Sequence, residues 1–259
     1  MSTKTKLNTI ALITIVKKEI IRIIRIWPQT LLPSAITSAL YFIIFGNFLG
    51  DRLGSIHEIK YISYLAPGFI MMAIISNSYG NIASSFFSEK FWNSYQELIW
   101  SPISIHTIML GYLMGGVIRG LSTGMIVTSI ALLFTHIHIA HPIITLIAAI
   151  TASIIFSLIG LINAIYAKSF DSITTIPNFV LTPLIYLGGV FYSIEILPTP
   201  WHEISLLNPI LYIINSFRYG MLNISDVAIT PALEASIISA VILYIFCYRL
   251  IKIGKGIKE

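Results

Sequence analysis

The chain has 259 residues, of which 56% are hydrophobic and only 10% are charged. Soluble domains carry roughly 25% charged residues, so this composition excludes a water-soluble globular protein. The net charge of +5 arises mainly from cations near the two ends, and no Lys, Arg, Asp or Glu occurs between Arg119 and Lys168. Long charge-free stretches between basic ends predict an all-α, polytopic membrane protein, and membrane orientation explains the positive charge without a nucleic acid partner.

Six stretches are long enough to cross a bilayer. A crossing helix needs about 20 apolar residues, because the hydrocarbon core is about 30 Å thick. The runs are continuous rather than alternating, which favours helices over a barrel. We expect transmembrane helices over residues 30–49, 62–86, 105–134, 143–167, 173–193 and 231–248. Residues 1–28 would form a cytoplasmic tail and interface helix, and residues 29–259 a single membrane domain.

The segment before the first span is basic and amphipathic. Lys17, Lys18, Arg22 and Arg25 interleave with apolar residues at three- and four-residue spacing. This pattern is typical of an interface helix that lies on the cytoplasmic surface with its cations toward anionic headgroups. A basic flank that only orients the first span fits the same pattern. A secretory signal is disfavoured, because Lys17, Lys18 and Glu19 stand where a small-residue cleavage site is needed.

Residues 204–223 could form a seventh span, but they contain Asn208, Pro209, Asn215 and Arg218. A seventh crossing would place the two termini on opposite sides of the membrane. With six crossings, twelve basic residues lie on the inner side and three on the outer side, which is a positive-inside distribution. We therefore expect both termini to be cytoplasmic. Residues 196–228 would then be outer-facing structure that dips into the membrane without crossing it.

The third predicted span contains closely spaced glycines and one charged residue. Glycines recur at four-residue spacing in the third span, at 111, 115, 116, 120 and 124, which predicts close helix packing. Arg119 is the one cation well inside a span. A charge at mid-bilayer costs about 3 kcal/mol, so Arg119 should point into the bundle or a wet cavity, or reach an interface.

Other polar side chains could line a path or gate for a transported molecule. The candidates are Asn77, Asn81, Asn163, Asn178, Tyr192, Trp201, Asn208 and Tyr212. Hydrogen bonding between helices is the alternative use of the same residues.

No complete enzymatic constellation appears in the sequence. It lacks H-E-x-x-H and a P-loop, and its single cysteine, Cys247, allows no disulfide or cysteine metal site within one chain. His136, His138 and His141 lie in a short hairpin without a nearby carboxylate, so we interpret them as a surface loop and expect no metal or cofactor. A membrane-embedded enzyme using these histidines or His202 stays open as an alternative, as does a passive channel or scaffold.

Two segments resemble a known family. Residues 187–193, Leu-Gly-Gly-Val-Phe-Tyr-Ser, together with Trp201, Tyr212 and Arg218, resemble the signature region of ABC-2 type transporter permeases. Residues 95–104 resemble the inner loop of that family, in which a Glu-Leu pair precedes Ser-Pro-x-Ser. Trp100 departs from it, because a small aliphatic residue is more usual there.

The resemblance implies the permease half of an exporter in the plasma membrane of a bacterium. Two copies would pair, and each would receive a separate ATP-binding subunit, which binds ATP and Mg²⁺, on the cytoplasmic face. It also implies an interface helix before the first span and two re-entrant helices between the fifth and sixth. The substrate is not specified, because the family exports drugs, lipids, lipo-oligosaccharides and polysaccharides.

The inner loop would be the docking segment for the ATPase. Its aromatic, acidic and apolar residues are Glu89, Phe91, Trp92, Tyr95, Glu97, Leu98 and Trp100. Buried aromatic anchors commonly dominate interface energies, and a short helix seated in a groove would pass rigid-body motion to the spans. An ordinary aromatic belt at the membrane surface is the alternative interpretation.

Overall fold

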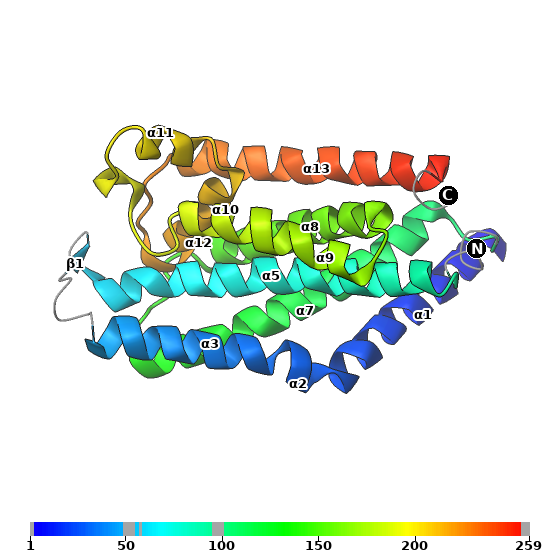
Figure 1. Ribbon diagram of the computed structural model, residues 1–259, viewed down its shortest axis with the longest axis horizontal. Helices are drawn as coiled ribbons and strands as arrows, with labels where there is room; N and C mark the ends of the chain where they lie inside the picture. The colour runs from blue at the N-terminus through cyan, green and yellow to red at the C-terminus, as the bar shows by residue number, and fades with distance from the viewer. Residues whose placement is uncertain (1–2, 49–54, 57–58, 95–100, 255–259) are drawn as a thin grey trace.

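The computed structural model describes residues 3–48, 55–56, 59–94 and 101–254, and it is a bundle of long helices (Figure 1). The beginning of α1 and the end of α13 lie at one end of this bundle, called the proximal end below; β1 and α11 lie at the opposite, distal end (Figure 1). The elements before the core are α1 (Thr3–Arg25), α2 (Trp27–Thr30), α3 (Leu32–Phe42), the π-helical turn η1 (Ile43–Phe48) and the antiparallel strands β1 (Ser55–Ile56) and β2 (Ile59–Lys60).

Four helical stretches are long and apolar enough to cross a membrane, namely Trp27–Gly46, α7 (Ile105–Phe134), α8 (Pro142–Tyr166) and α13 (Ile229–Ile253). They correspond to the first, third, fourth and sixth predicted spans. The second predicted span lies within α5 (Tyr61–Phe91), a helix of 31 residues. Serine and asparagine residues lower the hydropathy of its most apolar part. The helix is buried along nearly its whole length at the centre of the bundle.

The fifth predicted span, residues 173–193, is helical but ends at Leu187 and changes pitch midway, so the expectation of a regular helix as far as Ser193 is wrong. The chain forms α9 (Phe170–Ile176), the π-helical turn η2 (Pro177–Leu181) and α10 (Thr182–Leu187) in succession. Pro177 and Pro183 lack the backbone N–H that a regular helix uses, which accounts for the change in helical pitch. Gly188 caps α10, and Gly189 follows in a left-handed conformation with φ of 78°, so the last residues of the predicted span form a turn.

The region between α10 and α13 contains η3 (Ile194–Ile196), α11 (Trp201–Leu206) and α12 (Pro209–Leu222). Asn208 caps α12 by accepting the backbone N–H of Ile210 at 3.0 Å. The 14 residues of α12 extend about 21 Å at 1.5 Å each, which is less than the thickness of the hydrocarbon core. This helix alone is therefore too short to be a seventh crossing.

Glycines allow the close packing at the core. A Cβ on Gly120 of α7 would lie 1.9 Å from the Ser78 hydroxyl of α5, and one on Gly160 of α8 would lie 2.5 Å from the Tyr79 carbonyl oxygen. These backbones touch where no side chain could fit, as the small-residue spacing predicts. α5, α7 and α8 consequently form a tight central unit that holds the surrounding helices in place.

Candidate functional site

The first helix packs against the core through one buried face. Ile15, Glu19 and Ile23 are buried, and the first two lie over glycines of α7. A Cβ on Gly111 would come 2.5 Å from Ile15, and one on Gly115 would come 2.8 Å from Glu19. Ile10, Ile13, Ile21 and Ile24 on other faces of α1 are more than half exposed. α1 is thus attached to the bundle on one side and presents apolar side chains on the other.

Glu19 is the centre of a buried polar cluster. Its side chain is fully buried, and its Oε2 accepts a hydrogen bond from Asn81 Nδ2 at 3.0 Å. Oε1 accepts one from the hydroxyl of Ser85, and Arg22 Nε lies 3.8 Å from Oε2. A buried carboxylate requires such partners, since an unpaired charge would be costly. The cluster joins α1 to α5.

Arg22 turns into the same cluster. Its guanidinium donates to the Asn81 carbonyl at 2.8 Å, to Asn81 Oδ1 at 3.1 Å and to the Ser84 hydroxyl at 3.3 Å. Burial lowers the pKa of Arg22, and the Glu19 carboxylate opposes that shift. The prediction that all four interface-helix cations face lipid headgroups does not hold for Arg22, because acceptors on α5 hold it inside the protein.

The other three cations of the interface helix differ among themselves. Lys18 forms an ion pair with Glu89 near the end of α5, so it also faces the protein. Lys17 and Arg25 are exposed, and the headgroup interpretation stays a prediction for these two.

Arg119 points into the bundle, as its position in a span requires. Its Nε donates to Asn77 Oδ1 at 3.3 Å, and Asn77 Nδ2 in turn donates to the Ser34 hydroxyl of α3 at 3.0 Å. Asn77 and Asn81 are four residues apart on α5, so both side chains lie on one face of this helix, one turn apart. Asn77 binds Arg119 and Asn81 binds Arg22. Two of the predicted path residues therefore hold partly buried arginines in place.

A hydroxyl-rich groove lies on the other side of Ser34. It encloses about 270 Å³ between α3, α5 and α10. The hydroxyl-bearing residues that line it are Ser34, Thr37, Ser38, Tyr41, Ser76, Thr182 and Tyr186. The sequence analysis named none of the hydroxyl-bearing residues of α3 as path candidates. The spacing of Ser34, Thr37, Ser38 and Tyr41 on one helical face was the available signal.

Aromatic rings lie at the distal end of this groove. The ring of Phe191 lies 5.3 Å from that of Tyr186, 6.0 Å from that of Tyr41 and 5.6 Å from that of Phe69. Tyr61 donates a hydrogen bond to the Phe191 carbonyl at 2.8 Å. Phe191 belongs to the segment that carries the family resemblance, and it gathers α3, α5 and α10 around one ring. The sequence prediction named its neighbour Tyr192, which is only partly buried.

Most other predicted path residues connect helices, which was the alternative interpretation. Asn163 donates to the Tyr79 hydroxyl at 2.6 Å and to the Ile173 carbonyl at 3.0 Å. Asn208 donates to the Leu184 carbonyl at 2.6 Å, and the Tyr212 hydroxyl donates to that of Leu206 at 2.8 Å. Asn178 and Trp201 are exposed.

Arg218, which the sequence placed outside the membrane, is fully buried. Its guanidinium lies 4.2 Å from the centre of the Tyr64 ring, donates to the Gly189 carbonyl and lies 4.0 Å from Asp226 Oδ2. Asp226 also accepts hydrogen bonds from the Ser193 hydroxyl and the Ile194 N–H, both at 3.0 Å. Gly189 and Arg218, 29 residues apart near the two ends of the signature region, thus meet in one cluster.

The predicted docking segment begins at the proximal end of α5. Phe91 is 50% exposed and Trp92 is 73% exposed, so two aromatic residues are available there for a partner. Tyr95, Glu97, Leu98 and Trp100 lie outside the described residues. Lys90 donates to the Ala167 carbonyl at 3.0 Å and to that of Ile165; burial and then the nearby Lys168 lower the pKa of Lys90.

α1 contacts this segment on both sides. Lys18 pairs with Glu89 at its start, and Asn8 Oδ1 accepts the backbone N–H of Ser104 at its end at 3.0 Å. A surface groove of about 390 Å³ between α1 and residues 101–103 lies beside the second contact. A force on the segment would therefore reach α1 as well as α5.

The histidines form no cluster in the part of the chain that is described. His136 and His138 are exposed, while His141 stacks on Tyr219 at 5.0 Å and its Nε2 lies 2.9 Å from Asn223 Oδ1. No group of three potential metal ligands occurs among the described residues.

Membrane-crossing helices around a polar groove, with an exposed aromatic segment at one end, are the features of a transport permease. The ABC-2 type transporter family matches residues 10–222, and the chain belongs to that family. It is 46% identical over 250 residues to the inner membrane transport permease YadH of Escherichia coli (strain K12), covering 96% of this chain and 98% of that protein. It is also 22% identical over 204 residues to nodulation protein J of Neorhizobium galegae, covering 76% of each.

Proposed function

We propose that this permease is the membrane half of a bacterial exporter and that a separate ATP-binding subunit drives it. The observation that carries the proposal is the pair of contacts by which α1 holds both ends of the docking segment, Lys18 with Glu89 and Asn8 with Ser104. Such a segment would move as one body with α1 and α5. The chain would need no cofactor of its own, because the partner would bind ATP and Mg²⁺.

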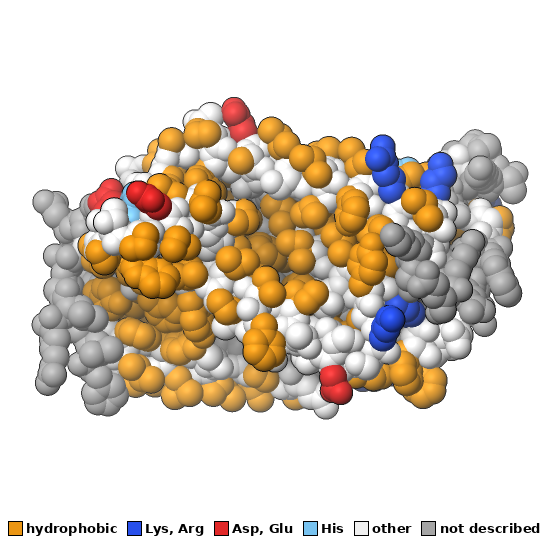
Figure 2. All heavy atoms as spheres, turned by 45° about the horizontal axis from the view of Figure 1, so that its top comes forward, with side chains coloured by type: hydrophobic (Ala, Val, Ile, Leu, Met, Phe, Trp, Pro, Cys, Tyr) orange, Lys and Arg blue, Asp and Glu red, His pale blue; other side chains and the backbone are white. Residues whose placement is uncertain are grey.

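We place the proximal end in the cytoplasm of a bacterium, with the protein in its plasma membrane. Lys17 of α1, Lys90 near the end of α5, Lys168 after α8 and Lys252 near the end of α13 belong to segments that lie toward that end (Figure 1). Lys and Arg side chains on the face shown in Figure 2 gather toward it as well. Cytoplasmic segments carry such an excess of cations. The inner membrane location stated in the name of the E. coli relative supports the same assignment.

Six crossings fit this orientation. In addition to the four apolar stretches, α5 and the α9–η2–α10 segment would each cross once, since both run along the bundle (Figure 1). An even number of crossings returns α13 to the side on which α1 begins. α11 and α12 would then be re-entrant helices entering from outside, in keeping with the short length of α12.

The groove between α3, α5 and α10 would be half of the translocation path, completed by a second copy of the chain. Exposed apolar side chains flank it, among them Ile36 and Leu40 on α3 and Phe179 on η2. Its hydroxyls could bind a polar part of a substrate, and Arg119 supports Ser34 from behind through Asn77. Motion of α5 would change the width of this groove.

Trp92→Ala tests the proposed docking. The full chain, tagged and purified from its native membranes, should carry an ATP-binding protein, and the Trp92 variant should lose it. Trp201→Ala is the matched control, because Trp201 is 53% exposed at the distal end and should retain the partner. Equal recovery with both variants would contradict the assignment, and so would appreciable ATP hydrolysis by the purified chain alone.

A further inference from the structure

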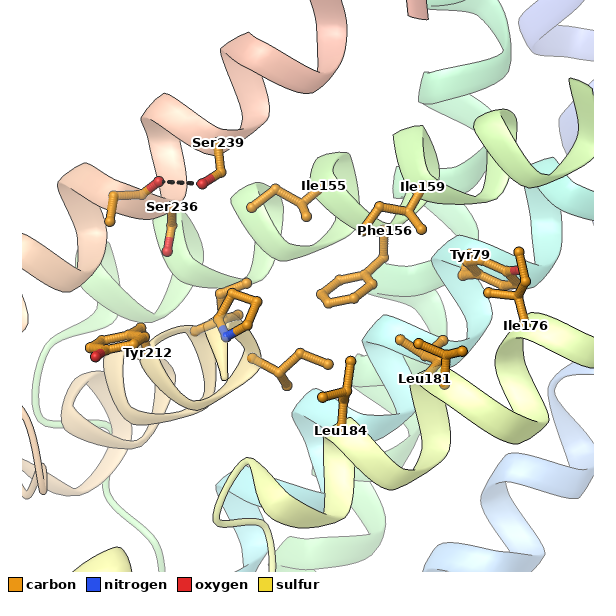
Figure 3. A pocket seen from close by; sticks show the side chains of 15 residues that line it. Tyr79, Ile155, Phe156, Ile159, Ile176, Leu181, Leu184, Tyr212, Ser236 and Ser239 are labelled. Atoms are coloured by element: carbon orange, nitrogen blue, oxygen red, sulfur yellow. Dashed lines mark hydrogen bonds between the residues drawn. The ribbon is translucent and has the colours of Figure 1, made fainter. Parts of the chain in front are cut away.

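A second cavity lies behind the proposed path and has no part in it. It encloses about 180 Å³ between α8, the α9–η2–α10 segment, α12 and α13. Figure 3 shows Phe156 of α8 at its centre, with Leu181 and Leu184 on one side and Ser236 and Ser239 of α13 on the other.

The wall of this cavity offers hydrocarbon to an occupant. Eleven of its fifteen lining residues are Ile, Val, Leu, Phe, Pro or Ala. Each of the four hydroxyl-bearing residues already has a partner inside the protein: Tyr79 with Asn163, Tyr212 with the Leu206 carbonyl, Ser236 with that of Ala232 and Ser239 with that of Ala235. A polar ligand would lose its hydration here without replacement, so the wall selects an apolar occupant.

The cavity is continuous with the lipid-facing surface of α13. Ala235 and Ser239 line it and are exposed, and the adjoining outer face of this membrane-crossing helix presents Ile238, Val241 and Ile242, each more than half exposed. A cavity of about 150 Å³ with apolar walls stays free of water but takes up a molecule the size of benzene. This cavity is somewhat larger, and the surrounding bilayer supplies hydrocarbon chains at its opening.

We propose that this cavity is a binding site for one acyl chain of a membrane phospholipid. The chain would enter between α10 and α13 and lie against Phe156 and Leu184. The α10 segment separates the two cavities, since Thr182, Ile185 and Tyr186 face the hydroxyl-rich groove while Leu181 and Leu184 face the apolar one. A resident acyl chain would therefore support α10 from behind and limit how far it can retreat from the groove.

Photo-crosslinking tests the site directly. The purified full chain is placed in nanodiscs of phosphatidylethanolamine and phosphatidylglycerol that contain a phosphatidylethanolamine with a diazirine in one acyl chain. After illumination, mass spectrometry locates the modified residues. We expect crosslinks on the recessed residues Phe156 and Leu184 in addition to those on exposed positions of α13. Crosslinks confined to exposed positions would overturn the proposal.

Ser239→Phe should fill the opening and abolish the crosslinks on Phe156 and Leu184. Val241→Phe is the control, because Val241 is 54% exposed on the outer face of α13 and should leave them intact. Ala235→Leu narrows the same opening and provides a second blocking variant if Ser239→Phe does not yield a monodisperse protein. Crosslinks that persist in the blocking variants would contradict the site. None of these results depends on the ATPase-docking experiment.

Discussion

Glu19 of α1 lies directly against Gly115 of α7, where a Cβ atom on the glycine would come 2.8 Å from both Cβ and Cγ of the glutamate. The glycine provides the space in which a fully buried carboxylate reaches Asn81 and Ser85. This contact determines where the first helix sits, and through Lys18 and Asn8 it also determines the position of the proposed docking segment.

Gly115→Ala should therefore destabilise the protein by about 1–3 kcal/mol, the usual cost of overpacking. Gly80→Ala is the matched control on α5, because a Cβ at that position would have no described atom within 4 Å apart from its chain neighbours and the backbone of its own helix. Removing a mid-helix glycine should stabilise by about 0.5–1 kcal/mol. The midpoints of thermal unfolding in detergent should thus shift in opposite directions. A rise for both variants would show that α1 does not pack on α7 as described.

Glu19→Ala should be far more damaging than Glu89→Ala. Removing Glu19 leaves the partly buried Arg22 without its carboxylate partner, and breaking a buried ion pair costs about 3–5 kcal/mol. The side chains of the Lys18–Glu89 pair are 47% and 19% exposed, and exposed pairs contribute about 1 kcal/mol or less. Yield and thermal midpoint of the two purified variants measure the difference. Equal losses would contradict the central place of Glu19 in the cluster.

Arg218→Lys should disrupt the distal cluster although the charge is kept. The guanidinium stacks on Tyr64 and reaches Gly189 and Asp226 at once, and an ammonium group cannot reproduce that planar geometry. We expect a lower thermal midpoint and faster proteolysis between α10 and α13. Arg249→Lys, at an exposed position, serves as the control. Wild-type behaviour of both variants would argue against a structural role for the cluster.

Thr37→Cys distinguishes a wet groove from a lipid-facing surface. Thr37 lines the hydroxyl-rich groove, and a thiol there should react with a charged, water-soluble thiosulfonate. Met125→Cys is the control. The native Met125 side chain is 65% exposed on α7, on a surface that we expect to face lipid, so a cysteine there should not react with the water-soluble thiosulfonate. The native Cys247 is fully buried and should contribute little background. Labelling at position 125 without labelling at 37 would rule out the groove as a water-accessible path.

The sequence predicts the apolar framework well, because length and hydropathy alone decide which segments can enter a bilayer. It gives the wrong end for the fifth span, because the helix stops at Leu187, and it does not predict the π-helical turn near Pro177 and Pro183. Arg22 shows a different limit: its acceptors on Asn81 lie 59 residues away, and no local pattern indicates that a headgroup-type cation turns inward.

Disulfide formation between two copies is the most direct measurement of the proposed shared path. Phe179→Cys, at a side chain that is 79% exposed beside the groove, should give a covalent dimer when membranes are oxidised mildly. Leu133→Cys, at a side chain that is 81% exposed on α7, should remain monomeric. A dimer through position 133 with none through 179 would place the second copy on the wrong face and contradict a path formed between two grooves.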